Sequence, residues 1–143
     1  MLKLLVPVDG SDTSLRAVEY VIKMRSAYKD PPELHVINVQ PPMPFGSRVS
    51  SVIGHDAVEK YHREEGLKAL QGAVQKLDAA GVKYAQHICV GEPAETIADY
   101  AKQKAVDQIV MGTRGAGAPS SLFLGSVATK VVHLVSVPVL LLK

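Results

Sequence analysis

Three glycines and a serine follow an apolar run near the end of the chain. The run is Gln108–Met111, and the pattern Gly-x2-Gly-x9-Gly-Ser comprises Gly112, Gly115, Gly125 and Ser126. Glycine lets backbone N–H groups approach an anion closely, and a helix N-terminus adds a favourable dipole. The residues that follow Gly125 have the character of a helix. The segment therefore predicts a strand, a phosphate-binding loop and a helix, which together form a nucleotide site.

Apolar runs of strand length alternate with amphipathic segments along the chain. Strands are expected at Leu2–Val8, Glu33–Val39, Lys83–Val90, Gln108–Met111 and Val137–Leu142. Helices are expected at Thr13–Tyr28, at Ala57–Ala80, from Pro93 onward and from Gly125 onward. This alternation predicts a single-domain α/β protein over residues 1–143, with a doubly wound, five-stranded parallel sheet and helices on both faces. Ligands of such sheets bind beyond the carboxyl ends of the strands, where the strand order reverses.

The connections carry their own signals. Ser11 or Asp12 is expected to cap the first long helix, and Gly81 to end the second. The stretch Gln40–Asp56 is rich in proline, glycine and serine, which predicts a long connection of the kind that is often functional. Asp9 closes the first strand. It can begin an Asx-type turn, contact a ligand, or do both.

Composition limits the classes of function. A chain of 143 residues with 47% hydrophobic residues can form one ordinary core. A net charge of +2, with scattered basic residues, argues against nucleic acid as a partner. The single cysteine, Cys89, is typical of a reducing compartment, and no apolar run approaches the roughly 20 residues that span a bilayer. We therefore expect a soluble, cytoplasmic protein with no membrane partner and no secretion signal.

Several spaced motifs give the chain its resemblance to a known family. They are Leu5–Ser11, Gly91–Pro93, Met111–Gly115, Gly125–Val127 and Val137–Leu140. In this order and over the whole length, the chain resembles the ATP-binding branch of the universal stress protein family. The resemblance implies a strand order of 3-2-1-4-5, a fold like that of the adenine nucleotide alpha hydrolases, and a small stress-response regulator. It also implies ATP in the crevice, or ADP or AMP, with Mg²⁺ or Mn²⁺ on the phosphates.

The resemblance assigns site residues by position. Asp9 would contact the nucleoside, and Arg114 offers a charge-assisted contact to phosphate. The adenine pocket would be lined by Pro7, Val8, Val39 and Met111. The phosphates and ribose would be held by Gly112, Gly115, Gly125, Ser126 and Val127. No catalytic residue and no protein ligand for a metal is assigned, and Gly112→Val is expected to abolish ATP binding while leaving the fold intact.

One departure from the family pattern keeps other functions open. The loop residues 116–124 contain no basic residue, whereas members of the family often have one or two there. A triphosphate would be held more weakly, so that AMP or ADP could compete. The alternatives are a slow ATPase or self-phosphorylating protein, with Ser120, Ser121 or Ser126 as acceptor, and a dimeric module that binds no nucleotide.

The last strand and the remaining titratable residues complete the expectations. Val137–Leu142 is uncharged and lies at a sheet edge in the implied order, where an apolar strand needs a cover. The resemblance implies a homodimer through this strand, and the regulatory role implies a further, unidentified protein partner. The five histidines form no convincing metal pair and are expected at the surface or the edge of the core. Cys89 is expected to be a small buried side chain.

Overall fold

A parallel sheet between two layers of helices accounts for most of the chain. The computed structural model describes residues 1–43, 46–115, 118–119 and 123–143. Within them, five parallel strands form a sheet in the order β3-β2-β1-β4-β5. The strands are β1 Lys3–Pro7, β2 Glu33–Gln40, β3 Ala85–Val90, β4 Gln108–Gly112 and β5 Val139–Leu142. The predicted fold class and strand order are confirmed.

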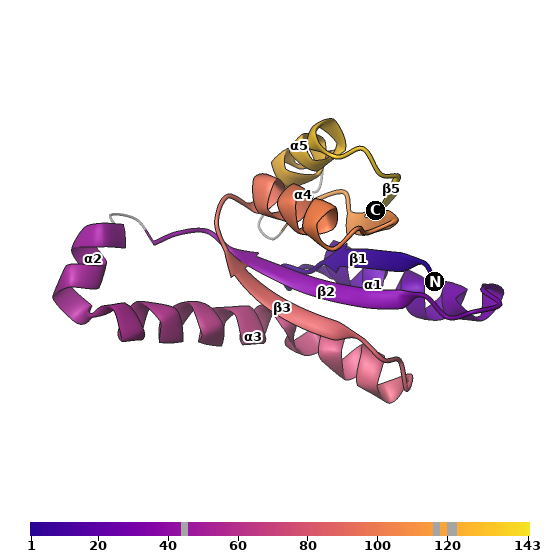
Figure 1. Cartoon of the computed structure of the whole chain (residues 1–143), viewed down its shortest axis with the longest axis horizontal. Coiled ribbons are helices and arrows are strands. Elements are labelled where there is room, and N and C mark those ends of the chain that lie inside the picture. Colours follow the sequence, from indigo (N-terminus) through magenta and orange to yellow (C-terminus); the bar gives the residue numbers. More distant parts are fainter. Residues whose placement is uncertain (44–45, 116–117, 120–122) are drawn as a thin grey trace.

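Helices cover both faces of the sheet. They are α1 Asp12–Met24, α2 Gly46–Ile53, α3 His55–Ala79, α4 Pro93–Gln103 and α5 Ser126–Leu134, with a short 3-10 turn η1 at Arg25–Ala27. The helices α1 and α3 pack on one face, and α4 and α5 pack on the other (Figure 1). No helix among the described residues is long and apolar enough to cross a bilayer.

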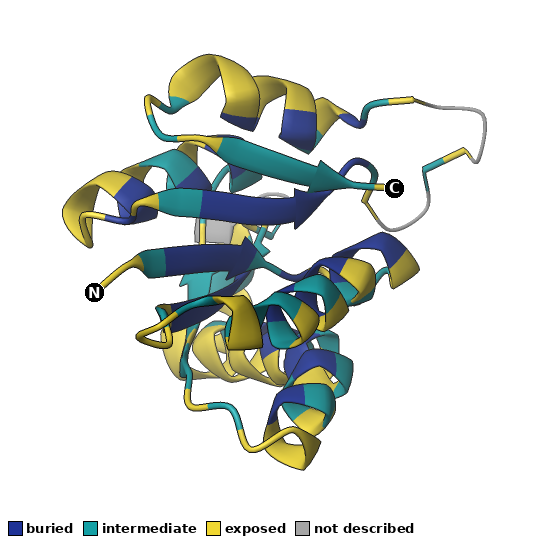
Figure 2. Cartoon of the chain, turned by 90° about the vertical axis from the view of Figure 1, so that its right-hand side faces the viewer, coloured by how far each residue is buried: buried dark blue, intermediate teal, exposed yellow. Residues whose placement is uncertain are grey.

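The central strand is buried on both sides because each face of the sheet meets a separate helical layer. Leu4 and Val6 of β1 belong to the core under α1 and α3, whereas Leu5 belongs to the core under α4 and α5. Figure 2 shows the middle of the sheet buried between helices whose outer faces are exposed. This arrangement explains why β1 is a continuous apolar run with no alternation of polar residues.

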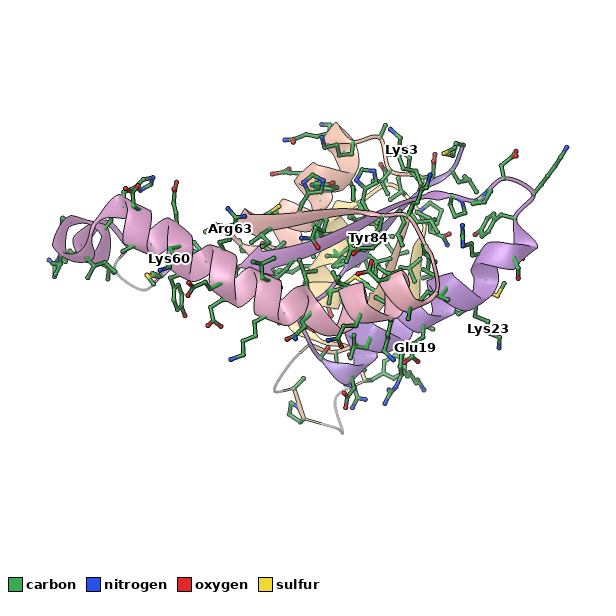
Figure 3. The ribbon with its side chains drawn as sticks, turned by 90° about the horizontal axis from the view of Figure 1, so that it is seen from below. Lys3, Glu19, Lys23, Lys60, Arg63 and Tyr84 are labelled. Carbon is green, nitrogen blue, oxygen red and sulfur yellow. The ribbon has the colours of Figure 1, made fainter. Side chains whose placement is uncertain are left out.

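Local capping fixes where the helices begin and end. The Ser11 side chain accepts a hydrogen bond from the Ser14 N–H at 3.3 Å, which confirms Ser11 as the cap of α1. Gly81 follows α3 with a φ of +67°, a left-handed conformation that glycine adopts without strain. An ion pair of 2.8 Å between Lys76 of α3 and Glu19 of α1 joins the two helices, and Figure 3 shows Glu19 where they run side by side.

The structure corrects several expected boundaries. The first long helix ends at Met24 rather than Tyr28. The stretch Gln40–Asp56 is not a continuous loop, because it contains α2, which lies beyond the sheet and packs on α3 (Figure 1). Val49, Val52 and Ile53 follow the helical spacing, but the prolines and serines around them hid that period in the sequence. The third strand begins at Ala85 rather than Lys83, and the last begins at Val139 rather than Val137.

The expectation of surface histidines is wrong for His35 and His62, which are 6% and 7% exposed. His35 of β2 satisfies both ring nitrogens. One lies 2.7 Å from the Tyr100 hydroxyl and the other 2.8 Å from the Glu33 carboxylate. These bonds remove the cost of burying a polar ring. Burial raises the pKa of Tyr100 to about 12, so this hydroxyl stays protonated at neutral pH. Cys89 on β3 is half-buried, and burial raises the pKa of its thiol.

His87 on β3 stacks on His35, with ring centroids 6.2 Å apart, and lies 5.2 Å from the Tyr100 ring. Burial lowers the pKa of His87, and its electrostatic interactions with His35 and Lys104 lower it further. The groups that face it are His35 from β2, the Tyr100 ring from α4, and Lys104, which follows the last residue of α4. The site favours the neutral imidazole.

We predict that acidification destabilises the fold through His87. Because its pKa is lower in the folded chain, the unfolded chain binds the proton more readily. The stability that neutral His87 contributes is present above its unfolded pKa of about 6.5 and is lost as the pH falls from that value through the lower pKa of the folded chain. Urea unfolding at pH 7.5 and pH 5.5 should show a smaller loss of stability in His87→Gln than in the wild type. An equal loss in both proteins would contradict the prediction.

Candidate functional site

A cavity of about 670 Å³ opens at the carboxyl ends of β1, β2 and β4. It lies where the strand order reverses, because β1 continues into α1 on one face and β4 leads to α5 on the other. This is the place where doubly wound sheets bind ligands. The structure brings all eleven sequence-predicted residues to its lining: Pro7, Val8, Asp9, Val39, Met111, Gly112, Arg114, Gly115, Gly125, Ser126 and Val127.

Sequence reasoning missed about as many lining residues as it found. These are Ser14, Ile37, Asn38, Pro41, Pro93, Ile97, Thr113, Ala118, Pro119 and Ala128. Several of them are next to a predicted residue in the chain, so extending each predicted strand end or loop by one residue would have found them. Pro93 and Ile97 carried none, because they reach the cavity from α4 only through the tertiary packing of that helix.

The inner wall of the cavity is apolar and rigid. Val8 is 2% exposed and Met111 is 6% exposed, and both belong to the core layers of the sheet. Ile97 of α4 is buried as well and completes this wall. A slot of this kind fits a flat aromatic ring better than it fits a charged group, since burying a charge without a partner costs free energy.

Asp9 lies between the first strand and the glycine loop. One carboxylate oxygen accepts a hydrogen bond from the Ser11 N–H at 2.9 Å, which confirms the Asx-type turn. The other oxygen faces the glycine loop, because a methyl group built on Gly115 would lie 3.0 Å from it. Asp9 is therefore held at the rim of the cavity. Its contact with a ligand stays a prediction.

The glycine loop is attached to the start of α1. A Cβ atom on Gly112 would lie 2.8 Å from the Thr13 side chain and 2.9 Å from the Thr13 backbone carbon. The Thr13 hydroxyl donates a hydrogen bond of 2.5 Å to the Arg114 carbonyl oxygen. The expectation that Gly112→Val leaves the fold intact is therefore wrong, because any side chain at Gly112 must displace α1.

The first turn of α5 faces the cavity with few groups to satisfy it. Gly125 is the N-cap and has no side chain to bond the first amides. Its own N–H donates to the Thr113 carbonyl oxygen at 2.6 Å, which fixes the entry into the helix. Ser126, at the first helical position, is exposed. Unsatisfied N–H groups and the helix dipole make such a terminus favourable for an anion.

Side-chain charge contributes little to this anion site. Among the described residues that line the cavity, the charged ones are Asp9 and Arg114. Lys130, one turn beyond Ser126, is held 3.7 Å from the Glu92 carboxylate. Glu92 in turn accepts a bond of 2.7 Å from the Glu95 N–H, and this bond is the main reason that its pKa is lowered. Ser120 and Ser121, the expected phosphate acceptors, lie outside the described residues.

Comparisons with known proteins agree on one family. The model of the universal stress protein family matches residues 1–143. The universal stress protein YxiE of Bacillus subtilis is 33% identical over 147 residues, covering 99% of this chain and 98% of that protein. Universal stress protein MJ0531 of Methanocaldococcus jannaschii is also 33% identical, over 141 residues that cover 99% of this chain and 81% of that protein.

Solved structures repeat the fold over the full length. The structure of MJ0577 matches with a TM-score of 0.80 at 26% identity, covering 99% of this chain and 94% of that one. UspA from Lactobacillus plantarum matches with a TM-score of 0.82 at 23% identity, with 99% and 97% covered. A universal stress protein in complex with cAMP matches with a TM-score of 0.69 at 25% identity, again with 99% and 97% covered.

Proposed function

The chain belongs to the universal stress protein family, and we propose that it is a regulatory protein that binds an adenine nucleotide in the cavity between β1 and β4. One observation carries the proposal. Eleven residues chosen from the sequence, on four separate segments, line a single cavity at the switch point of the sheet. The relative that was solved with cAMP supports the same ligand class.

Backbone groups of β2 supply what an adenine ring requires. The Val8 N–H bonds to the Ile37 carbonyl and the Gly91 N–H bonds to the Gln40 carbonyl. Backbone groups of a strand alternate in direction, so those of Val39 face the β1 side, past the last residue of β1. Within the described part of the chain, neither group of Val39 has a hydrogen-bond partner. One donor and one acceptor side by side match the adenine edge, which presents an acceptor at N1 and a donor at N6.

In this proposal the phosphates lie at the first turn of α5, where backbone N–H groups and the helix dipole attract an anion. Ser126 and Val127 begin this turn, and Gly115 allows the loop to approach closely. A bound Mg²⁺ or Mn²⁺ would offset the charge of a di- or triphosphate, which Arg114 alone does not balance. ATP, ADP and AMP could all bind in this way. Because the loop carries little positive charge, it would hold a triphosphate more weakly, so that ADP or AMP could compete with ATP.

Nucleotide binding is proposed to act as a signal to another protein. The cavity is lined by residues of the glycine loop and by Pro41, which leads into the connection to α2. A ligand shifts a conformational equilibrium only as far as its affinities for the two states differ. A nucleotide bound in the cavity is therefore expected to change the surface that the glycine loop and the connection to α2 form. A cytoplasmic partner protein would bind at this surface.

We predict that Ser126→Asp weakens ATP binding at least tenfold without loss of stability. A carboxylate at the first position of α5 interacts favourably with the helix dipole and stabilises the helix by about 0.3–1 kcal/mol. The same carboxylate repels a phosphate a few ångströms away. Isothermal titration with Mg-ATP measures the affinity, and urea unfolding measures the stability. Ser126→Asn is the matched control, because it has the same shape without the charge. If Ser126→Asp and Ser126→Asn bind ATP with equal affinity, the phosphates do not lie at the first turn of α5.

We also propose a homodimer through β5. All four residues of β5, Val139–Leu142, are only half-buried although all are apolar. The carbonyl oxygens of Pro138 and Leu142 accept hydrogen bonds from β4, so the backbone groups of Val139 and Leu141 face outward from the sheet edge. An apolar edge with free backbone groups pairs readily with a second strand. Pairing with the same strand of another copy gives a two-fold dimer.

The alternation along β5 allows a matched pair of tests for this dimer. Leu141→Pro removes an outward N–H and should give a folded monomer in analytical ultracentrifugation. Leu140→Pro removes an N–H that faces β4 and should instead destabilise the fold, as proline does inside a ladder. A Leu141→Pro protein that sediments as the wild type does would exclude pairing through this edge.

A further inference from the structure

A side chain replaces one hydrogen bond of the ladder between β1 and β2. The Val8 N–H donates to the Ile37 carbonyl at 2.7 Å. In a regular parallel ladder the next bond would run from the Val39 N–H to the Val8 carbonyl. Instead, the side-chain amide of Asn38 donates to the Val8 carbonyl at 2.8 Å. The Val8 carbonyl is satisfied, and the Val39 N–H has no hydrogen-bond partner within the part of the chain that the structure describes.

The Asn38 amide is held in this orientation from its other end. Its oxygen accepts a hydrogen bond of 2.6 Å from the Gln40 side-chain amide. Because a carbonyl only accepts, the Asn38 atom that faces Val8 must be the nitrogen, and the Gln40 bond agrees with this assignment. Asn38 is 2% exposed. A buried amide has few other partners, so the two bonds fix its rotamer.

We propose that Asn38 is the positioning residue for nucleobase recognition. By bonding to Val8 it prevents Val39 from closing the ladder, and it thereby keeps the Val39 N–H and C=O directed at the cavity that both residues line. The inference rests on the proposed adenine site and assigns the base selectivity of that site to a side chain that need not touch the ligand.

Loss of the amide has a defined consequence. Without a donor from Asn38, the Val8 carbonyl has no partner, and the nearest group that the ladder geometry offers is the Val39 N–H. Leaving a buried carbonyl unpaired costs about as much as a hydrogen bond contributes, so the end of β2 closes toward β1. The donor that adenine requires is then consumed within the sheet.

The first test is base selectivity in Asn38→Leu, a variant of similar size that has no donor. ATP and GTP share the sugar and the phosphates, but the donor and acceptor at positions 1 and 6 of the base are reversed. We expect ATP affinity to fall about tenfold, the effect of one or two lost hydrogen bonds, and GTP affinity to change less than twofold. Val36→Ala, on the same face of the same strand and fully buried, is the control for destabilisation alone and should preserve the ratio of the two affinities.

The second test observes the ladder without any nucleotide. Amide hydrogen exchange by NMR should show fast exchange at Val39 in the wild type and slower exchange at Val39 in Asn38→Leu, because the N–H becomes bonded to Val8. Unchanged exchange at Val39, or a ratio of ATP to GTP affinity that Asn38→Leu preserves, would overturn the role of Asn38. A wild-type protein that binds neither nucleotide would refute the proposed function itself, and the base-positioning role would be refuted with it.

Discussion

Two crossover connections leave the centre of the sheet in opposite directions, and the functional geometry depends on this divergence. The chain turns from β1 into α1 on one face, whereas it reaches α5 from β4 on the other. Between the two turns, a cavity of about 670 Å³ opens at the carboxyl ends of the strands. The Val8 N–H at this end is paired with the Ile37 carbonyl, but the backbone groups of Val39 have no partner among the described residues, so a ligand or water can satisfy them. The hydrogen-bonding groups of the proposed site thus come from the backbone, and the Asn38 side chain is proposed to keep those of Val39 available.

The start of α1 links the stability of the fold to the shape of the cavity. Thr13 contacts the backbone at Gly112 and bonds to the Arg114 carbonyl, so the helix supports the glycine loop directly. Asp9 bonds to Ser11, the cap of the same helix. A substitution at Gly112 therefore changes packing as well as access to the cavity. Ser126 is exposed at the first turn of α5. A substitution there can disturb the proposed phosphate site with much less effect on the core.

Strand order and the approximate site followed from the sequence because local signals and the family resemblance agreed. Apolar runs marked the strands, Ser11 and Gly81 marked helix ends, and the spaced glycines marked the loop. The burial of His35 was missed because one of its partners, Tyr100, comes from α4, 65 positions away. Asn38 was missed for a related reason. A polar residue within an apolar strand indicates that its side chain has a hydrogen-bond partner in the core. The sequence does not identify that partner, because Val8 is 30 positions away and only the sheet brings the two residues together. The helix α2 was hidden because proline and serine dominate its surroundings.

Nucleotide carried through purification provides the most direct evidence on whether this cavity binds an adenine nucleotide. Freshly purified protein would be denatured, and the released small molecules would be identified and quantified by mass spectrometry. An adenine nucleotide at close to one per chain is the expected result, and the species found would show whether the loop retains ATP or a nucleotide with fewer phosphates. Absence of any nucleotide, together with no rise in melting temperature when Mg-ATP, ADP or AMP is added, would contradict binding and favour a dimeric module without a nucleotide.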